Sequence, residues 1–512
     1  MKRTFPIYLL LATLFGGAVS SCESDMEIPT ENDETAYEYS VMVNSFKLTA
    51  NDSVAFNLDS LFFAIDLDRA EIFNPDSLPK GIAIGKIPVE IDLPGVSEAT
   101  ITMPSGKGDE TTTVNYLENK NDSIDFSKGQ VKLHLKSYNG KVSRDYTIKV
   151  NIHKMEPDSL TWDKMAVRAL PGSLSAPTES RTLAFGDEVL CYTTDGSSAQ
   201  LSKCENPFSG VWTSKTVTLP EGAKLRSITA TPDALFLIDS SDNLYTSADG
   251  EAWTSTGAKM HHIYGGYEDT LIGVDLGDDG IYRHATYPGG TSTVAVASGC
   301  PVEGTSGAVT YTTKWAAKPM MMIVGGKTAA GNPVGTTWAY DGGEWACVTD
   351  PYYEIEPISG ATIFPYFSFT TDYTTWEATR YDMLFAVGGM KADGTCNDKI
   401  YLSPDRGVHW STSQGLLAKP NFLPNLYNLD GLVRENTMYV NSRAASGWKE
   451  FTISYPCWYR PVYTLDGSRA VTPITEWDCP FIYLFGGNKA DGSFNNEVWR
   501  GVINRLLFRP IQ

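Results

Sequence analysis

Three stretches in the second half of the chain share one pattern of apolar and polar positions. In each, an apolar run ends at a glycine doublet, and a polar loop and a second run follow. This second run reaches an aromatic residue 13 positions after the first glycine (325 to 338, 388 to 401 and 486 to 499). The stretches are Met321–Trp338, Met383–Tyr401 and Phe481–Trp499. Apolar runs that alternate with turns at a fixed spacing predict β-strands in a repeated sheet unit.

Four other segments show a related pattern of strand, tight polar turn and strand. They are Val189–Leu201, Leu235–Tyr245, Thr270–Tyr282 and Thr437–Ile453. With the glycine copies they make about seven units of roughly 50 residues, a length that suits a four-stranded propeller blade. We therefore expect residues 154–512 to form a β-propeller of about seven blades, with six and eight also open. Residues 160–168 are candidates for a strand that closes the ring on the last blade.

Residues 36–153 have the alternating pattern of half-buried strands. Val131–Leu135 and Tyr146–Ile152 flank Asn139-Gly140, a pair that favours a type I′ hairpin turn. Further strands are expected at Tyr39–Phe46, Val54–Phe56, Val89–Leu93 and Ala99–Met103. About seven short strands predict an immunoglobulin-like β-sandwich, a module that commonly serves as a spacer. The expected fold class is therefore all-β, with a sandwich followed by a propeller.

Two short motifs resemble known propeller elements. Ser403–Trp410 matches the Asp-box, and Ser247–Trp253 is a form shorter by one residue. The resemblance implies a structural turn between the outer strands of a blade, away from the usual ligand face. The glycine copies, with Asn397-Asp398 and Asn496-Glu497 after two of them, resemble kelch repeats of the galactose-oxidase-like kind.

The first 35 residues read as targeting and tether segments. Lys2 and Arg3 precede a short apolar run, and Val19-Ser20-Ser21-Cys22 resembles the lipobox of bacterial lipoproteins. That resemblance implies that residues 1–21 are a signal peptide and that acylated Cys22 anchors the chain in a lipid bilayer. Ordinary secretion with cleavage near Ser20 is the alternative. Residues 22–35, with six acids and no base, are expected to be a flexible tether. They also resemble the export signal of surface lipoproteins, although a solvated spacer would look the same.

Charge and cysteine spacing exclude some classes of function. The net charge is −20, and loss of residues 1–21 would leave 39 basic and 61 acidic residues, a net charge of −22. Such a surface repels phosphate backbones, so no nucleic-acid partner is expected. Seven scattered cysteines follow Cys22 without CxxC spacing, which argues against a zinc site or a disulfide framework. Most are expected to be small buried side chains, with one or two pairs between neighbouring strands left open.

A short triplet recurs, in which Asp is followed by Ser or Thr and then by an aliphatic residue. It resembles the O-glycosylation sequon of exported proteins in gut anaerobes, and Asp-Ser is equally good turn chemistry. The hydroxyl residues it marks are Ser53, Ser60, Ser77, Ser123, Ser159 and Thr270.

No catalytic residue, metal site or cofactor is predicted, because HExxH, GxSxG and P-loop motifs are missing from the sequence. His261-His262 falls at the start of an expected inner strand and could line a central channel, but a structural pair is favoured. The carboxylate pairs Glu354/Glu356 and Glu476/Asp478 are more simply explained by solvent exposure.

The connection between the Gly325 and Gly388 units is long, at 63 residues, and rich in aromatic side chains. Long loops on a rigid propeller tend to carry recognition, and flat rings stack on sugars. We expect Tyr352, Tyr353, Tyr366 and Trp376 to contact a ligand. The alternative is that such rings belong to a strand of the blade.

Taken whole, the chain resembles a family of two-domain lipoproteins of unknown function from gut-type Gram-negative bacteria. The expected function is a lipid-anchored binding protein at the outer membrane or cell surface, whose propeller face captures a glycan or an envelope protein. One alternative is a polysaccharide-acting hydrolase or lyase that uses propeller-face carboxylates. The other is a structural component of an envelope complex.

Overall fold

The computed structural model describes residues 38–504, apart from 52, 56–57, 75–77, 79, 153–158, 164–167, 313–316, 372–377 and 440–475. These residues form strands joined by turns and four short 3-10 helices: η1 (Leu58–Ser60), η2 (Pro207–Ser209), η3 (Leu225–Ser227) and η4 (Gly415–Leu417). The chain divides into two compact units, with the division after Asn151. The all-β expectation is confirmed.

The N-terminal unit contains a six-stranded sheet and a separate two-stranded sheet. The larger sheet has the order β2-β3-β8-β7-β5-β6, and the smaller one pairs β1 with β4. The strands are β1 (Ser45–Leu48), β2 (Ala64–Asp66), β3 (Glu71–Phe73), β4 (Val89–Asp92), β5 (Val96–Pro104), β6 (Thr111–Asn115), β7 (Val131–Ser137) and β8 (Ser143–Lys149). Strands β3 and β8 run parallel, whereas the other pairs are antiparallel. Alternation explains the core, because Val131, Leu133 and Leu135 on one face of β7 are fully buried.

Three local expectations in this unit need correction. Strands β7 and β8 form the predicted hairpin, but only Gly140 of the turn pair has a positive φ, at 71°. A type I′ turn needs two such residues, so the turn is of another type, closed by Gly140 N donating to Ser137 O at 2.9 Å. Val54 and Ala55 form no strand, since Ala55 makes only an isolated bridge to Asn51, and Phe56 lies outside the described residues. The first strand begins at Ser45 and not at Tyr39.

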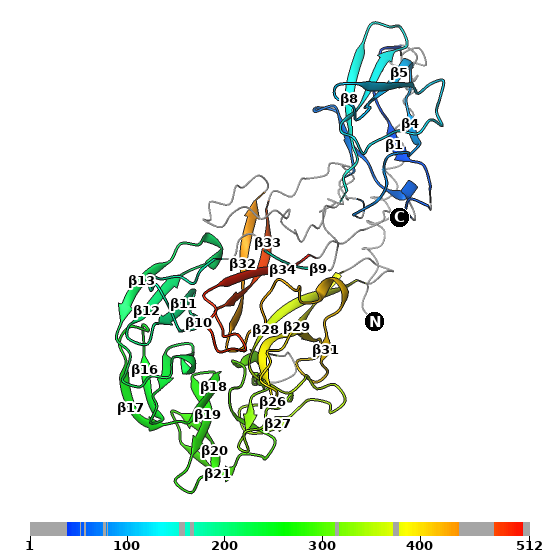
Figure 1. The fold of residues 1–512 in the computed structure, drawn as a ribbon. Coiled ribbons are helices and arrows are strands. Elements are labelled where there is room, and N and C mark those ends of the chain that lie inside the picture. Colours follow the sequence, from blue (N-terminus) through cyan, green and yellow to red (C-terminus); the bar gives the residue numbers. More distant parts are fainter. Residues whose placement is uncertain are drawn as a thin grey trace, which may run out of the picture. The chain divides into compact units, whose positions relative to one another are not determined.

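The second unit consists of four-stranded antiparallel sheets, and six of them lie in the described residues. They are, in order, β10-β11-β12-β13, β14-β15-β16-β17, β18-β19-β20-β21, β23-β24-β26-β27, β28-β29-β30-β31 and β32-β33-β34-β9. Figure 1 shows these sheets following one another around a ring, from green through yellow to red. The β-propeller expectation is confirmed.

The strand bounds show short, similar blades, with longer strands in the fifth and sixth. They are β9 (Ser159–Trp162), β10 (Glu179–Phe185), β11 (Glu188–Thr194), β12 (Ala199–Cys204), β13 (Thr213–Val217), β14 (Thr229–Ala230), β15 (Leu235–Ile238), β16 (Asn243–Ser247), β17 (Thr254–Lys259), β18 (His262–Tyr267), β19 (Thr270–Leu276), β20 (Tyr282–Tyr287), β21 (Thr291–Ala295), β22 (Pro301–Glu303), β23 (Val309–Tyr311), β24 (Met320–Val324), β25 (Lys327–Thr328), β26 (Thr337–Tyr340), β27 (Trp345–Cys347), β28 (Ile358–Thr371), β29 (Ala378–Lys391), β30 (Ile400–Ser403), β31 (Ser411–Thr412), β32 (Asp430–Tyr439), β33 (Glu476–Phe485) and β34 (Val498–Asn504). Strands β22 and β25 form a small extra sheet.

The ring is closed by the first strand of the unit. Strand β9 pairs antiparallel with β34, so the sixth sheet takes its fourth strand from the beginning of the propeller. The first strands of neighbouring sheets contact one another, including β10 with β14, β28 with β32, and β32 with β10. Closure by residues 160–168 is thus confirmed for the part within β9, and Arg168 adds a bridge to Val498.

The described residues form six such sheets, against an expectation of about seven with six and eight also open. The sequence pattern treats the segment from Thr437 and the Gly486 copy as separate units. In the structure Thr437 lies in β32, opposite Asp478 of β33 in the same sheet. The surplus length goes into long strands instead of an additional blade, since β28 and β29 have 14 residues each.

The glycine doublets turn the chain where the second strand of a blade meets the next blade. Gly388 and Gly389 have φ values of 73° and 105°. A Cβ on Gly388 would lie 2.6 Å from Leu426 O, so only glycine fits both the conformation and the space. Asn397, which is fully buried, donates from Nδ2 to Gly388 O at 3.1 Å. Asn495, the residue before the Asn496-Glu497 pair, makes the equivalent bond in the last copy.

Both Asp-box segments form turns between the third and fourth strands of a blade. Asp405 Oδ1 accepts hydrogen bonds from Ser403 Oγ and His409 N, both at 2.9 Å. Trp410 is buried and donates from Nε1 to Thr337 Oγ1 of the preceding blade at 2.9 Å. The motif therefore joins adjacent sheets, as its resemblance implied.

Candidate functional site

The inner strands of the propeller enclose a pocket of about 700 Å³. Residues from the first strand of every one of the six sheets line it, namely β10, β14, β18, β23, β28 and β32. Because these strands follow one another around the ring, the pocket lies at the centre of the propeller. Its size falls within the usual range for small-molecule sites.

One wall is built around Asp430, at the start of β32. This carboxylate is 3% exposed and is held from two other blades. Arg181 Nη1 donates to Oδ1 at 2.6 Å, and Arg226 Nη1 donates to Oδ2 at 2.7 Å. The Thr182 amide adds a third hydrogen bond, to Oδ2 at 2.7 Å. We call Arg181, Arg226 and Asp430 the arginine wall.

The arginines are themselves fixed by backbone carbonyls. Arg181 Nε donates to Ile228 O at 2.8 Å, and Arg226 Nη1 also donates to Ser180 O at 2.9 Å. Burial lowers the pKa of Arg181, an effect that the Asp430 charge opposes. Burial also raises the pKa of nearby Glu179. The positive charge of Arg226 and a hydrogen bond from its backbone act in the opposite direction and lower this pKa. The wall thus presents two oriented guanidinium groups over one buried carboxylate.

A second part of the lining carries the histidine pair. His261 Nδ1 lies 2.9 Å from Asp242 Oδ2, and Lys224 Nζ donates to the other oxygen of that carboxylate at 2.6 Å. His262 Nε2 lies 2.8 Å from Thr305 Oγ1. Burial lowers the pKa of His262 to about 3, so this ring is neutral near pH 7. The two histidines line the channel, and both also have structural partners.

The predicted aromatic residues do not gather into one platform. Tyr352 is 92% exposed in the loop before β28, and Tyr353 packs edge-on against His409, with ring centroids 4.8 Å apart. The Trp410 amide donates to Tyr353 O at 3.0 Å, which places this pair beside the Asp-box turn and not among the residues that line the pocket. Tyr366 is 2% exposed and donates to Pro480 O, so it belongs to the core. Trp376 lies outside the described residues.

Only the first of the two carboxylate pairs can be placed from the side chains that the structure describes. Glu354 is exposed, whereas Glu356 accepts ion pairs from Lys391 at 3.2 Å and Lys399 at 3.5 Å. The side chains of Glu476 and Asp478 lie outside the described residues. Solvent exposure and lysine pairing account for the first pair.

The residues proposed for modification fall into three groups. Ser53 and Ser123 are exposed, while Ser60, Ser159 and Thr270 are half-buried, the last two within strands. Ser77 and Cys22 lie outside the described residues, as do residues 1–21 and the tether. Glycosylation and lipidation stay predictions.

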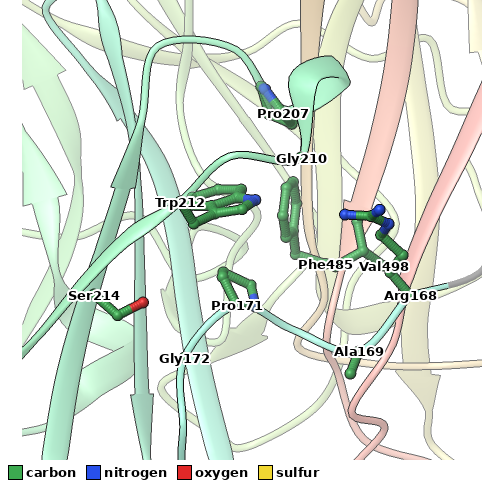
Figure 2. Close-up of a pocket in the computed structure, with 10 residues that line it drawn as sticks. All are labelled: Arg168, Ala169, Pro171, Gly172, Pro207, Gly210, Trp212, Ser214, Phe485 and Val498. Carbon is green, nitrogen blue, oxygen red and sulfur yellow. The ribbon is translucent and has the colours of Figure 1, made fainter. Parts of the chain in front are cut away.

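A smaller cavity of about 300 Å³ lies where the first sheet meets the last (Figure 2). Trp212 and Phe485 meet edge-to-face in its wall, with ring centroids 6.1 Å apart. Arg168 lines it too, and burial lowers the pKa of its guanidinium. Trp212 precedes β13 and Phe485 ends β33, while Arg168 bridges to Val498 of β34, so the cavity lies at the seam between the first and last sheets.

Three further observations concern the described part of the chain. No group of three metal-binding side chains occurs there. No helix within it has the length and apolar character needed to span a membrane. Cys191, Cys204, Cys300 and Cys396 are buried thiols, as expected, whereas Cys347 is exposed. Burial raises the pKa of Cys191 to about 12, so this thiol is not reactive.

Sequence reasoning found the histidine pair but missed the arginine wall. Arg181 and Asp430 are 249 positions apart, and Arg226 comes from a loop that matches no motif. A lone arginine near the start of an inner strand was the only local signal. The role of this arginine in the arginine wall depends on ring closure, which brings the first and last sheets together.

Comparison with known proteins places the chain in a family without assigning it an activity. No curated protein matches it. The solved structure titled "Structure of YjhT" is similar at 11% identity and a TM-score of 0.36, covering 64% of this chain and 95% of its own. BamB from Moraxella catarrhalis is similar at 13% identity and a TM-score of 0.23, covering 65% and 97%. Similarities at this level carry no argument about function.

Two family models match almost the whole described region. Residues 30–150 match the N-terminal domain of a domain of unknown function, DUF6242. Residues 156–511 match the DUF6242 beta propeller domain. The chain therefore belongs to the two-domain DUF6242 family of unknown function.

Proposed function

We propose that this protein is a binding protein whose propeller captures a small polar ligand, such as the end of a glycan, in the central pocket. The observation that carries this proposal is the pocket of about 700 Å³ lined by inner strands of all six described sheets. Its lining combines charged side chains with the polar groups of His262, Thr305 and Asn428. A rigid ring that holds such groups in place suits recognition, because ligand binding then costs little conformational entropy of the protein.

We further propose that the protein works at the outer membrane or cell surface, anchored through acylated Cys22. The basic start, the apolar run and the lipobox-like segment support this address. In this arrangement the N-terminal unit serves as an immunoglobulin-like spacer, and the propeller is of the kelch-like kind. The positive-φ glycine doublets and the buried Asn397 favour the kelch assignment. Loss of palmitate labelling in a Cys22→Ala variant tests the anchor, and unchanged labelling would refute it.

Gly307 offers a direct test of the pocket. It lines the cavity, and a Cβ built on it meets no atom within 4 Å. Gly307→Trp should therefore fill the pocket without disturbing the sheets. Gly290 is the matched control, since its Cβ also meets open space but it lies in the exposed turn between β20 and β21.

A glycan array and a soluble sugar library would be screened with the full chain and both variants. Binding that is lost in Gly307→Trp and kept in Gly290→Trp supports the proposal. Ligands that bind all three proteins equally would place recognition elsewhere, with the exposed Tyr352 and Tyr353 as the next candidates. Release of product from a polysaccharide would instead favour the hydrolase or lyase alternative. A co-purifying envelope protein, with no glycan bound, would favour a protein partner.

A further inference from the structure

The central pocket reverses the charge balance of the chain. The whole protein has a net charge of −20, yet the charged residues of the lining are Arg181, Lys224 and Arg226 against Glu303 and Asp430. Field lines in a cleft are focused by the low-dielectric walls, so a local excess of positive charge acts strongly on a ligand inside.

The ion pairs show where this excess lies. Lys224 is paired with Asp242 at 2.6 Å, and Glu303 with Lys327 at 3.5 Å. Asp430 faces two guanidinium groups, at 2.6 Å and 2.7 Å, so one carboxylate is shared by two cations. Glu179 is a second carboxylate near Arg226, and burial raises its pKa and so disfavours its charged form.

The arginines also retain donors for a ligand. Arg181 uses Nε and Nη1, and Arg226 uses Nη1. Within the described residues, neither Nη2 atom has a hydrogen-bond partner. The side chains of Arg181 and Arg226 are 16% and 27% exposed, and both line the pocket. Two guanidinium groups held by backbone carbonyls and a buried carboxylate are oriented before any ligand arrives, and such groups favour oxyanions that can accept two parallel hydrogen bonds.

We propose that the central pocket binds a small hydroxylated monoanion, whose carboxylate or sulfate group lies on Arg181 and Arg226. The hydroxyl groups of this ligand bond to the polar part of the lining at His262, Thr305 and Asn428. This inference rests on the proposed function, and it adds the chemical class of the ligand.

The test compares glucuronate, glucose and inorganic sulfate as probes of the full chain by isothermal titration. Glucuronate should bind and glucose should not, since they differ in the anionic group. Affinity should fall when NaCl is raised from about 20 mM to about 300 mM, because salt screens the interaction. Weak binding of sulfate alone would show that the anionic group is sufficient. Binding of glucuronate but not sulfate would show that the hydroxyl groups are needed as well.

Three variants assign the site. Arg226→Gln should weaken glucuronate binding at least about tenfold, the usual effect of losing one hydrogen bond to a charged group. Arg226→Lys keeps the positive charge but loses the pair of parallel N–H donors of the guanidinium group. Its affinity for glucuronate should therefore lie between those of Arg226→Gln and the wild type. Gly307→Trp should abolish binding with both arginines intact, which keeps the test valid if Arg226→Gln unfolds.

Some outcomes would overturn the inference. Equal binding of glucose and glucuronate, or full glucuronate affinity in Arg226→Gln, would show that the arginine wall is only structural. If neither glucuronate nor sulfate binds, the anion assignment is wrong. The proposed function would still stand if neutral sugars bound to the wild type and not to Gly307→Trp. Failure of the anion assignment can therefore be told apart from failure of the proposed function.

Discussion

Replacing Asp430 with Asn should destabilise the propeller through the arginine wall. The substitution keeps the shape of the side chain but removes the charge that two arginines share at 2.6 Å and 2.7 Å. Breaking a buried ion pair typically costs about 3–5 kcal/mol. Because the guanidinium groups are 16% and 27% exposed, we expect about 3 kcal/mol, the lower end of that range.

The assay is chemical denaturation followed by tryptophan fluorescence. All 12 tryptophans lie at position 162 or later, so the signal reports on the propeller and not on the N-terminal unit. Glu303→Gln is the control, since it removes an exposed ion pair with Lys327 worth at most about 1 kcal/mol. A loss below about 1 kcal/mol for Asp430→Asn would refute the reasoning. In the double variant Asp430→Asn/Arg226→Gln, part of the loss should be recovered, because one uncompensated charge has gone.

Three further perturbations test the repeat elements. Gly388→Ala should cost at least about 1 kcal/mol more than Gly394→Ala in the same denaturation assay. Both glycines have positive φ, at 73° and 81°, but only Gly388 is crowded, so similar losses would contradict the doublet argument. Trp410→Phe should cost about 1 kcal/mol for the lost bond to Thr337, and Trp410→Ala about 3–5 kcal/mol for the emptied space. Equal losses would show that packing is not the main contribution. The Asp405 carboxylate raises the pKa of His409, so this contact stabilises the fold at low pH and is lost as pH rises through the raised pKa. The Tm difference between wild type and His409→Gln should therefore be larger at about pH 5 than at about pH 9, and a pH-independent difference would exclude the contribution.

Local chemistry made the blades predictable from sequence. The doublets at Gly325, Gly388 and Gly486 supply the positive φ values of the repeat, and the Asp-box closes its own turn through Asp405 and Ser403. Such elements need only neighbours within a few positions. The count of about seven blades is not confirmed, because it depends on which strands pair, and Thr437 and Asp478 meet across a long connection.

The candidate site was predictable only in part, for the same reason. His261-His262 sits at the start of β18, so an inner-strand position could be inferred from the repeat. The aromatic residues of the long connection divide between two settings, because Tyr352 and Tyr353 lie in the loop before β28, whereas the rest of the connection includes a pair of long strands. Tyr366 lies in one of these strands, with its hydroxyl group on Pro480 O. The arginine wall depends on ring closure, which no local pattern encodes.

The pairing of β9 with β34 sets an order for biosynthesis. Ser159–Trp162 leaves the ribosome more than 300 residues before its partner strand Val498–Asn504, so during most of translation β9 has no neighbour. The ring can therefore close only after nearly the whole polypeptide has emerged. Nascent chains, and products truncated before Val498, would expose an open sheet edge that invites pairing with other chains. Protection of that edge until the ring closes follows as a requirement of the architecture.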